Sequence, residues 1–241
     1  MTADKEEKPL YLGHRERLRQ RFMIDEGASM PDYELLELLL RLAIPRRDVK
    51  PLAKNLLAKY GNLQKLLQTP AHQLLDDFNL SETTLGAIRL VNTLAKRTIS
   101  LSLSSTNEPV FTNWDAFEDY CRLSFAGKNT EEFHVYFLDS NYRLKGEKTL
   151  SIGTIDGAPV HPREIIRAAM EHNCVNIILA HNHPNGVALP SSDDIATTES
   201  ICAAAQTMGI RVCDHLIITS GKIYSFRAHG RLPRSMGYDE Y

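Results

Sequence analysis

Two histidines and one acidic residue are spaced so that they could share a metal ion. His181 and His183 end an apolar run, residues 176–180, that favours a β-strand. Side chains at positions i and i+2 of a strand point to the same face, so both imidazoles could reach one ion. A turn beginning at Pro184 leads to Asp194, at the start of a predicted helix. Two nitrogens and one carboxylate leave a fourth position for water, which is the pattern of a catalytic zinc site.

A competing interpretation needs no metal. Ser191 and Asp194 also fit the S-x-x-D pattern of a capping box, in which both side chains satisfy backbone amides at the start of a helix. The histidines would then be polar residues beside a turn. The apolar strand, the turn and the downstream acid, taken together, favour the metal site.

These residues resemble a known family. His181-x-His183-Pro184, followed by Ser191 and Asp194, resembles the zinc-binding motif of the JAMM (MPN-type) metallopeptidases. The surrounding segments resemble the bacterial RadC-type family more specifically, whose members are labelled DNA repair proteins. The resemblance covers most of the chain and is strongest from about Glu131 to Gly230. The segments that carry it are 161–164, 181–186 and 214–218, together with 13–19 and 31–37 in the small leading domain.

The resemblance implies a zinc metallopeptidase, a hydrolase that cleaves a peptide or isopeptide amide with zinc-bound hydroxide. His181, His183 and Asp194 would hold Zn²⁺, which lowers the pKa of its bound water to roughly 7 and polarises the scissile carbonyl. The expected partner is a peptide or protein substrate. Ser191 would stabilise the oxyanion of the tetrahedral intermediate. That role competes with helix capping for one hydroxyl, unless Ser192 caps the helix instead.

The same family resemblance also indicates which residue would act as the general acid/base. In JAMM peptidases the catalytic glutamate comes just before a strand that pairs with the histidine strand. The RadC-like pattern Glu-x-Phe assigns this position to Glu131, two residues before Phe133. Glu132 is its near rival. Glu164 is a third candidate, although it also fits a helix's first turn, where a carboxylate complements the dipole.

Two further polar positions accompany the motif. Asn182 lies between the two histidines and is expected to face away from the metal. Asp214 and His215 lie in a later predicted strand. One of them could orient a ligand histidine, because such ligands usually donate their second N–H to a carboxylate or carbonyl. We favour a structural pair here.

Composition and charge bound the class of protein. The 241 residues include 28 Lys and Arg and 30 Asp and Glu. Residues 1–100 contain 16 basic and 13 acidic residues, and residues 101–241 contain 12 basic and 17 acidic residues. Neither half has the basic balance of a dedicated nucleic-acid binder. No apolar run approaches the roughly 20 residues that span a bilayer, and the charged N-terminus lacks a signal peptide's apolar stretch. We therefore expect a cytoplasmic protein with no membrane partner, its four cysteines reduced.

The expected fold class is α/β. A layered JAMM/MPN sheet domain, cytidine-deaminase-like and spanning residues 110–241, would follow a small all-α domain at 1–99 that is RadC-type and helix-hairpin-helix-like. The polar stretch 100–109 is the expected linker. Helices are expected at 15–22, 32–42, 48–60, 63–67, 70–78, 81–98, 113–124, 162–172 and 194–208, and strands at 133–138, 144–152, 176–180, 212–218 and 222–226.

Two other functions remain open. The leading domain could bind DNA, since arginines recur at 15, 17, 19 and 21, with further basic residues at 46, 47 and 50. Its expected hairpin turn, residues 79–82, lacks the glycines that allow close approach to phosphate. The chain could then be a DNA-associated repair or recombination accessory factor that uses the fold as a non-catalytic binding module. A metal-dependent nuclease is suggested only by the letters His-Asn-His, and would need a ββα arrangement. The sequence carries no signal for an oligomeric state.

Overall fold

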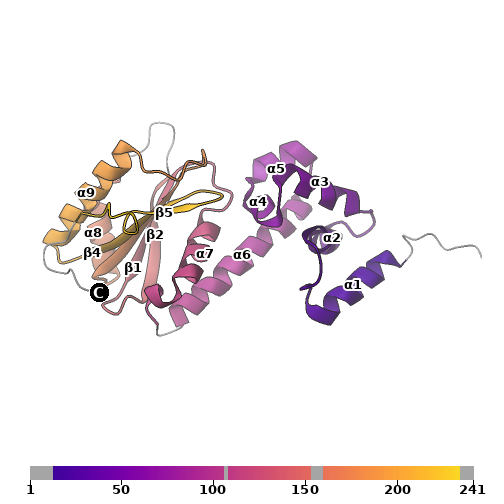
Figure 1. Cartoon of the computed structure of the whole chain (residues 1–241), viewed down its shortest axis with the longest axis horizontal. Helices are drawn as coiled ribbons and strands as arrows, with labels where there is room; N and C mark the ends of the chain where they lie inside the picture. The colour runs from indigo at the N-terminus through magenta and orange to yellow at the C-terminus, as the bar shows by residue number, and fades with distance from the viewer. Residues whose placement is uncertain (1–12, 106–107, 153–159, 234–241) are drawn as a thin grey trace, which may run out of the picture. The chain divides into compact units, whose positions relative to one another are not determined.

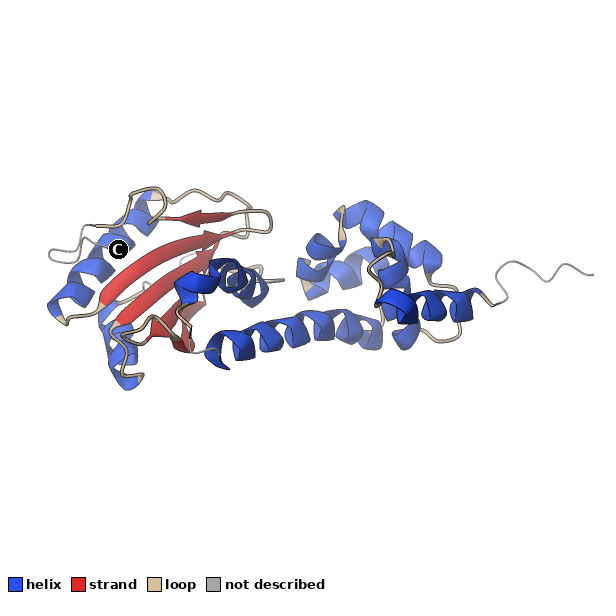
Figure 2. Ribbon diagram, turned by 60° about the horizontal axis from the view of Figure 1, so that its bottom comes forward, coloured by secondary structure: helices blue, strands red, loops and turns tan. Residues whose placement is uncertain are grey.

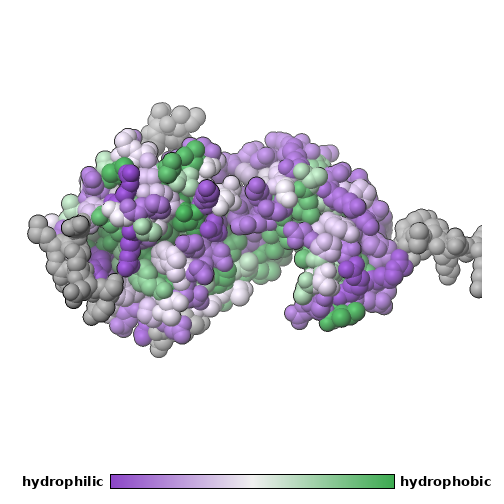
Figure 3. Space-filling view, viewed as in Figure 1, coloured by the Kyte–Doolittle hydropathy of each residue, from purple (hydrophilic) through white to green (hydrophobic). Residues whose placement is uncertain are grey.

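The structure, a computed structural model, describes residues 13–105, 108–152 and 160–233 (Figure 1). The chain folds into two compact units, Met1–Val91 and Asn92–Tyr241. Helix α6 (Glu82–Ser105) passes through this boundary. Each unit has its own hydrophobic core. Hydrophilic residues cover most of the visible surface in Figure 3, with smaller hydrophobic patches between them.

The first unit is entirely helical where it is described. Its core is made of leucines and other aliphatic side chains, among them Leu36, Leu56 and Ile88. The turn into α6 has no glycine. Asn79 takes the left-handed conformation there (φ 46°), and Ser81 accepts a hydrogen bond from the Thr84 amide at 3.2 Å. The helices before α6 are α1 (His14–Asp25), α2 (Asp32–Ala43), α3 (Lys50–Tyr60), α4 (Leu63–Gln68) and α5 (Ala71–Phe78).

The second unit is a five-stranded sheet between two layers of helices, which confirms the expected α/β class (Figure 2). The strand order is β2-β1-β3-β4-β5; β3 and β4 are parallel, and the other neighbours are antiparallel. Helices α8 and α9 pack on one face, and α7 with the last turns of α6 packs on the other. The bounds are β1 (Glu132–Leu138), β2 (Leu144–Ile152), β3 (Asn176–Asn182), β4 (Arg211–Ile218), β5 (Ile223–Ser225), η1 (Val110–Asn113), α7 (Trp114–Ser124), α8 (Pro162–Glu171) and α9 (Ser192–Thr207).

Strand β3 is apolar because both of its faces are buried. Ile177 and Leu179 pack against α8 and α9, whereas Ile178 and Ala180 pack toward α7. His181 continues the Ile177–Leu179 alternation and therefore lies on the α8–α9 face. The apolar alternation thus sets the face on which the first candidate ligand stands.

Helix α6 is longer than expected. It was predicted to end at Thr98, but it continues to Ser105, so the stretch expected to be a linker is helical over its first six residues. Leu103 is buried in the core of the second unit, and this apolar anchor extends the helix through a serine-rich sequence. The domain limits 1–99, 100–109 and 110–241 stay a prediction. None of the helices in the described ranges is both long and apolar enough to cross a membrane.

Candidate metal centre

The structure brings His181, His183 and Asp194 together. His181 lies near the end of β3, His183 begins the following loop, and Asp194 lies in the first turn of α9. Nε2 of His181 lies 3.0 Å from Nε2 of His183 and 3.0 Å from Oδ1 of Asp194. Nε2 of His183 lies 3.4 Å from Oδ2 of Asp194. Within the described residues, no fourth His, Cys, Asp or Glu joins this group.

The loop after β3 fixes the orientation of His183. Its backbone N–H donates to the Ile218 carbonyl at the end of β4, at 2.9 Å. Its ring Nδ1 lies 2.8 Å from the Val187 carbonyl oxygen. A carbonyl oxygen can only accept, so the neutral ring carries its proton on Nδ1. Nε2 is then left with a lone pair facing the group.

His181 is oriented by a second buried histidine. Its Nδ1 lies 2.8 Å from Nε2 of His215 on β4, and Nδ1 of His215 lies 2.6 Å from Oγ1 of Thr198 on α9. The Thr198 hydroxyl donates to the Asp194 backbone carbonyl at 2.5 Å. Thr198 had no signal as a site residue on its own, but it lies four positions after Asp194, on the same face of the helix.

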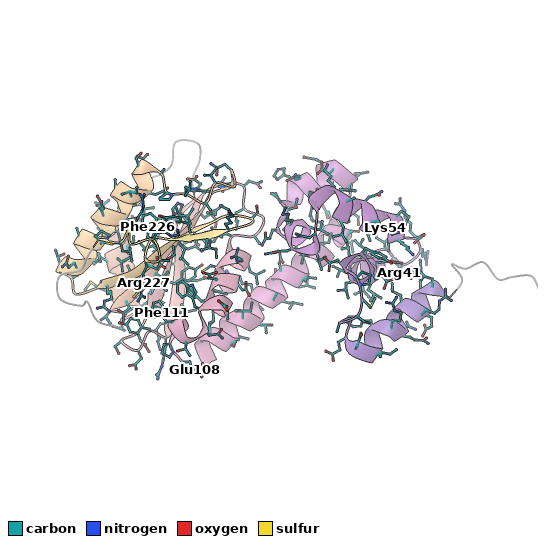
Figure 4. All side chains as sticks on the ribbon, in the orientation of Figure 1. Arg41, Lys54, Glu108, Phe111, Phe226 and Arg227 are labelled. Carbon is teal, nitrogen blue, oxygen red and sulfur yellow. The ribbon has the colours of Figure 1, made fainter. Side chains whose placement is uncertain are left out.

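Aromatic rings enclose His215, which is fully buried. Phe226, labelled in Figure 4, stacks on it with ring centroids 4.9 Å apart, and Phe133 meets it edge-on at 5.5 Å. Burial and the nearby His181 hold the pKa of His215 well below its ordinary value, so its ring is neutral. Its neighbour Asp214 turns away and accepts hydrogen bonds from the Ser225 hydroxyl and the Arg227 amide. The two neighbours therefore have different surroundings: Asp214 bonds to Ser225 and Arg227, whereas His215 contacts His181. The expectation of a structural pair stays a prediction.

Asp194 serves the helix and the cluster together. Its Oδ2 accepts from the backbone N–H and the hydroxyl of Ser191, both at 2.7 Å, and its own N–H donates to Ser191 Oγ at 3.1 Å. The capping box therefore exists, with Ser191 rather than Ser192 as the cap. Because the Ser191 hydroxyl proton is directed to Asp194 here, an oxyanion role would require that hydroxyl to rotate. This role stays a prediction.

The donor set fits a zinc ion. A tetrahedral ion with ligand bonds of about 2.0–2.1 Å sets its donor atoms about 3.3 Å apart. Two lone-pair nitrogens 3.0 Å apart, facing a carboxylate, repel one another unless a proton or a cation lies between them. Burial opposes ionisation of Asp194, but the facing His181 and His183 rings and the hydrogen bond from Ser191 hold its pKa well below its ordinary value. The carboxylate is therefore available as an anionic ligand.

Asn182 fixes the backbone on both sides of Glu131. Its side-chain oxygen accepts from the Glu132 N–H at 2.8 Å, and its amide donates to the Thr130 carbonyl at 3.0 Å. As expected, Asn182 faces away from the ligand cluster. Glu131 itself is exposed. The pKa of His183 is raised, mainly because its protonated ring would donate to Asp194, and the negative charge of Glu131 adds to this effect. The Glu131 carboxylate thus lies within electrostatic range of the cluster.

The two rival acids, Glu132 and Glu164, are not bonded to the candidate ligands in the part of the chain that the structure describes. Glu132 is buried and pairs with Lys128 at 2.8 Å and with His134 at 3.0 Å. His134 belongs to the α7 side of the sheet, opposite the cluster, since it alternates with Phe133 and Val135. Glu164 lies in the first turn of α8. In the ranges the structure describes, no hydrogen bond or ion pair joins either residue to the three candidate ligands.

Replacing Asn182 by Ala should destabilise the start of β1, directly after Glu131. The Glu132 N–H would lose its partner in a buried position, which costs about 1–3 kcal/mol. We expect the free energy of unfolding of metal-free protein to fall by that amount in a urea titration. Zinc affinity should change less than about threefold, because the Asn182 side chain bonds to the backbone of Glu132 and Thr130 and to none of the three ligand side chains. A tenfold loss of affinity with unchanged stability would contradict this assignment.

Most of the basic residues of the first unit are already engaged. Arg15 donates to the Pro45 and Arg47 carbonyls, Arg19 pairs with Glu16, and Arg21 pairs with Glu34. Arg41 and Lys54 are labelled in Figure 4. Arg41 pairs with Glu37, and Lys54 lies over the Tyr33 ring. These contacts reduce the number of cations that could neutralise phosphates. DNA binding through this unit stays a prediction.

Comparison with known proteins identifies the class. The chain belongs to the RadC-like JAB domain family, whose pattern matches residues 111–231, the range that holds the sheet and the ligand cluster. It is 40% identical over 225 residues to a UPF0758 protein of Ruegeria pomeroyi, covering 93% of this chain and 100% of the relative. It is 41% identical over 216 residues to a UPF0758 protein of Rhodobacter capsulatus, covering 89% of this chain and 100% of the relative. The expected family is thereby confirmed.

Proposed function

We propose that this protein is a zinc-dependent amide hydrolase, a metallopeptidase of the JAMM class. The observation that carries the proposal is the orientation of the two imidazoles. Each ring has its Nδ1 committed to a neighbour, so each Nε2 faces Asp194 with a free lone pair. Three protein donors with a carboxylate among them are typical of catalytic rather than structural zinc sites.

Each residue of the cluster would have a separate task. His181, His183 and Asp194 would hold the ion, which would acidify a water molecule and polarise the amide carbonyl. Glu131, close to the cluster and not one of its donors, would take the proton from that water and deliver it to the leaving nitrogen. Ser191 would donate to the developing oxyanion after releasing Asp194.

The nuclease alternative lacks support. His181 lies near the end of β3, the middle strand of a five-stranded sheet, and His183 begins the loop that leads to α9. This is not the ββα arrangement that such a nuclease would need. No feature of the ligand cluster favours a phosphodiester over an amide substrate. We therefore do not propose nuclease activity.

Metal analysis combined with a peptide-library assay tests the proposal. We expect about one zinc ion per chain after purification, and hydrolysis that stops when a chelator removes zinc and returns when zinc is added back. The products should be a free amine and a carboxylate, identified by mass spectrometry. A protein that binds zinc but cleaves no member of peptide and isopeptide panels, while it binds DNA in a salt-dependent manner, would favour the accessory-factor alternative.

A further inference from the structure

We propose that Thr198 and His215 are positioning residues that set the protonation pattern of the metal ligand His181. They form a hydrogen-bonded chain, hereafter the Thr198 relay, that runs from His181 through His215 and Thr198 to the backbone of Asp194. The relay therefore joins the ligand from β3 to the ligand from α9. This inference rests on the proposed metal site and identifies the residues that prepare it.

The direction of every hydrogen bond in the relay follows from its one carbonyl. The Asp194 oxygen has no proton, so at 2.5 Å the Thr198 hydroxyl must donate to it. That hydroxyl has one proton, so at 2.6 Å it must accept from Nδ1 of His215. A neutral His215 with its proton on Nδ1 has a lone pair on Nε2, which accepts from Nδ1 of His181 at 2.8 Å. Neutral His181 is then left with a lone pair on Nε2.

The surroundings of the relay keep water away from it. The exposed fraction of His215 is 0%, and Phe226 and Phe133 cover its ring. Thr198 is also buried, with an exposed fraction of 1%. A hydroxyl bonded to the carbonyl four residues earlier is common in helices, and alone would indicate no special role. What distinguishes Thr198 is that the same oxygen accepts from His215.

Without the Thr198 hydroxyl, the ring protons of His215 and His181 should each move to the other ring nitrogen. His215 Nδ1–H would have no acceptor in a buried site, so the proton would move to Nε2, where it can donate to His181. His181 would then carry its own proton on Nε2, toward Asp194, and would have to move it before binding an ion. Such supporting partners typically contribute 10–100-fold to metal affinity.

Histidine NMR of the metal-free protein tests the relay directly. The ¹⁵N and ¹³C shifts of labelled imidazoles distinguish the Nδ1–H from the Nε2–H form, and this readout needs neither zinc nor substrate. We expect Nδ1–H for His215 in the wild type and Nε2–H in the isosteric variant Thr198→Val. Wild-type protein with Nε2–H at His215 would overturn the proposal, even if the variant failed to fold.

Measurement of zinc affinity provides a second test of the relay. Competition with a chromophoric chelator should show a loss of about tenfold or more in Thr198→Val, and less than about threefold in Thr198→Ser, which keeps the hydroxyl. Equal affinities in wild type and Thr198→Val would contradict a positioning role. A protein that binds no zinc would refute the proposed function, while the tautomer of His215 would still decide whether the relay exists.

Discussion

Replacing Asp194 by Asn should remove zinc from the protein and, with it, amide hydrolysis. The amide is almost isosteric and can still accept from the Ser191 N–H, so the start of α9 should keep its cap. It has no negative charge to offset that of the ion. Residues that bond to a ligand but not to the ion already contribute about 10–100-fold to metal affinity. We therefore expect loss of a ligand's charge to lower zinc affinity by at least roughly a hundredfold.

The accompanying loss of kcat/KM should be roughly a thousandfold, corresponding to the several kcal/mol that a Lewis acid contributes. Chelator competition and a fluorogenic amide measure the two quantities. Asp193→Asn is the matched control, since Asp193 lies in the same first turn of α9 and is exposed. It should retain zinc and activity. If Asp194→Asn retained wild-type zinc affinity, the assignment of this ligand would be wrong.

Replacing Glu131 by Gln should abolish proton transfer while leaving the metal in place. A positioned general acid/base typically contributes 10²- to 10⁴-fold, so kcat should fall by about that factor. Glu131 is not among the donors within reach of the ion, so zinc content should be unchanged. Single-turnover hydrolysis with zinc analysis of the same sample separates the two effects. Equal cleavage by wild type and Glu131→Gln would refute the role.

Glu132→Gln is the control one residue away. It should keep kcat within about threefold, because Glu132 contacts Lys128 and His134 on the other face of the sheet. Burial opposes ionisation of Glu132, yet Lys128 and His134 lower its pKa below the ordinary 4.5. Its ionised form therefore stabilises the fold above about pH 4.5, and this contribution is lost as the pH falls through the lowered pKa. The stability gap between wild type and Glu132→Gln should shrink accordingly in acid.

The sequence predicted the elements well where apolar spacing determined them. Strand β2 has the expected bounds, and β1 and α2 begin or end within one residue of them. The three candidate ligands came from spacing along one strand and one helix start, and these are local properties. The end of α6 was missed because burial of Leu103, a tertiary contact, extended the helix through polar residues.

The role of His215 could not be read from alternation along β4. Val212 faces α8 and α9, so regular alternation would put Asp214 on that face and His215 on the other. A register shift between the pairs of Ile177 and Ile178 inserts an extra residue in β4. His215 consequently pairs with Leu179 and turns toward His181. Sequence patterns give no signal for such a bulge, and none for the two hydrogen bonds by which Asn182 holds the backbone around Glu131.

The sharing of Asp194 between helix cap and ligand cluster has a consequence for how the site is loaded. Its carboxylate is immobilised by the folding of α9, before any ion arrives. This side chain therefore loses its conformational entropy when the protein folds, and ion binding causes little further loss. The proposed zinc site should therefore exchange its ion without loss of the fold, unlike small zinc modules that unfold when the metal leaves.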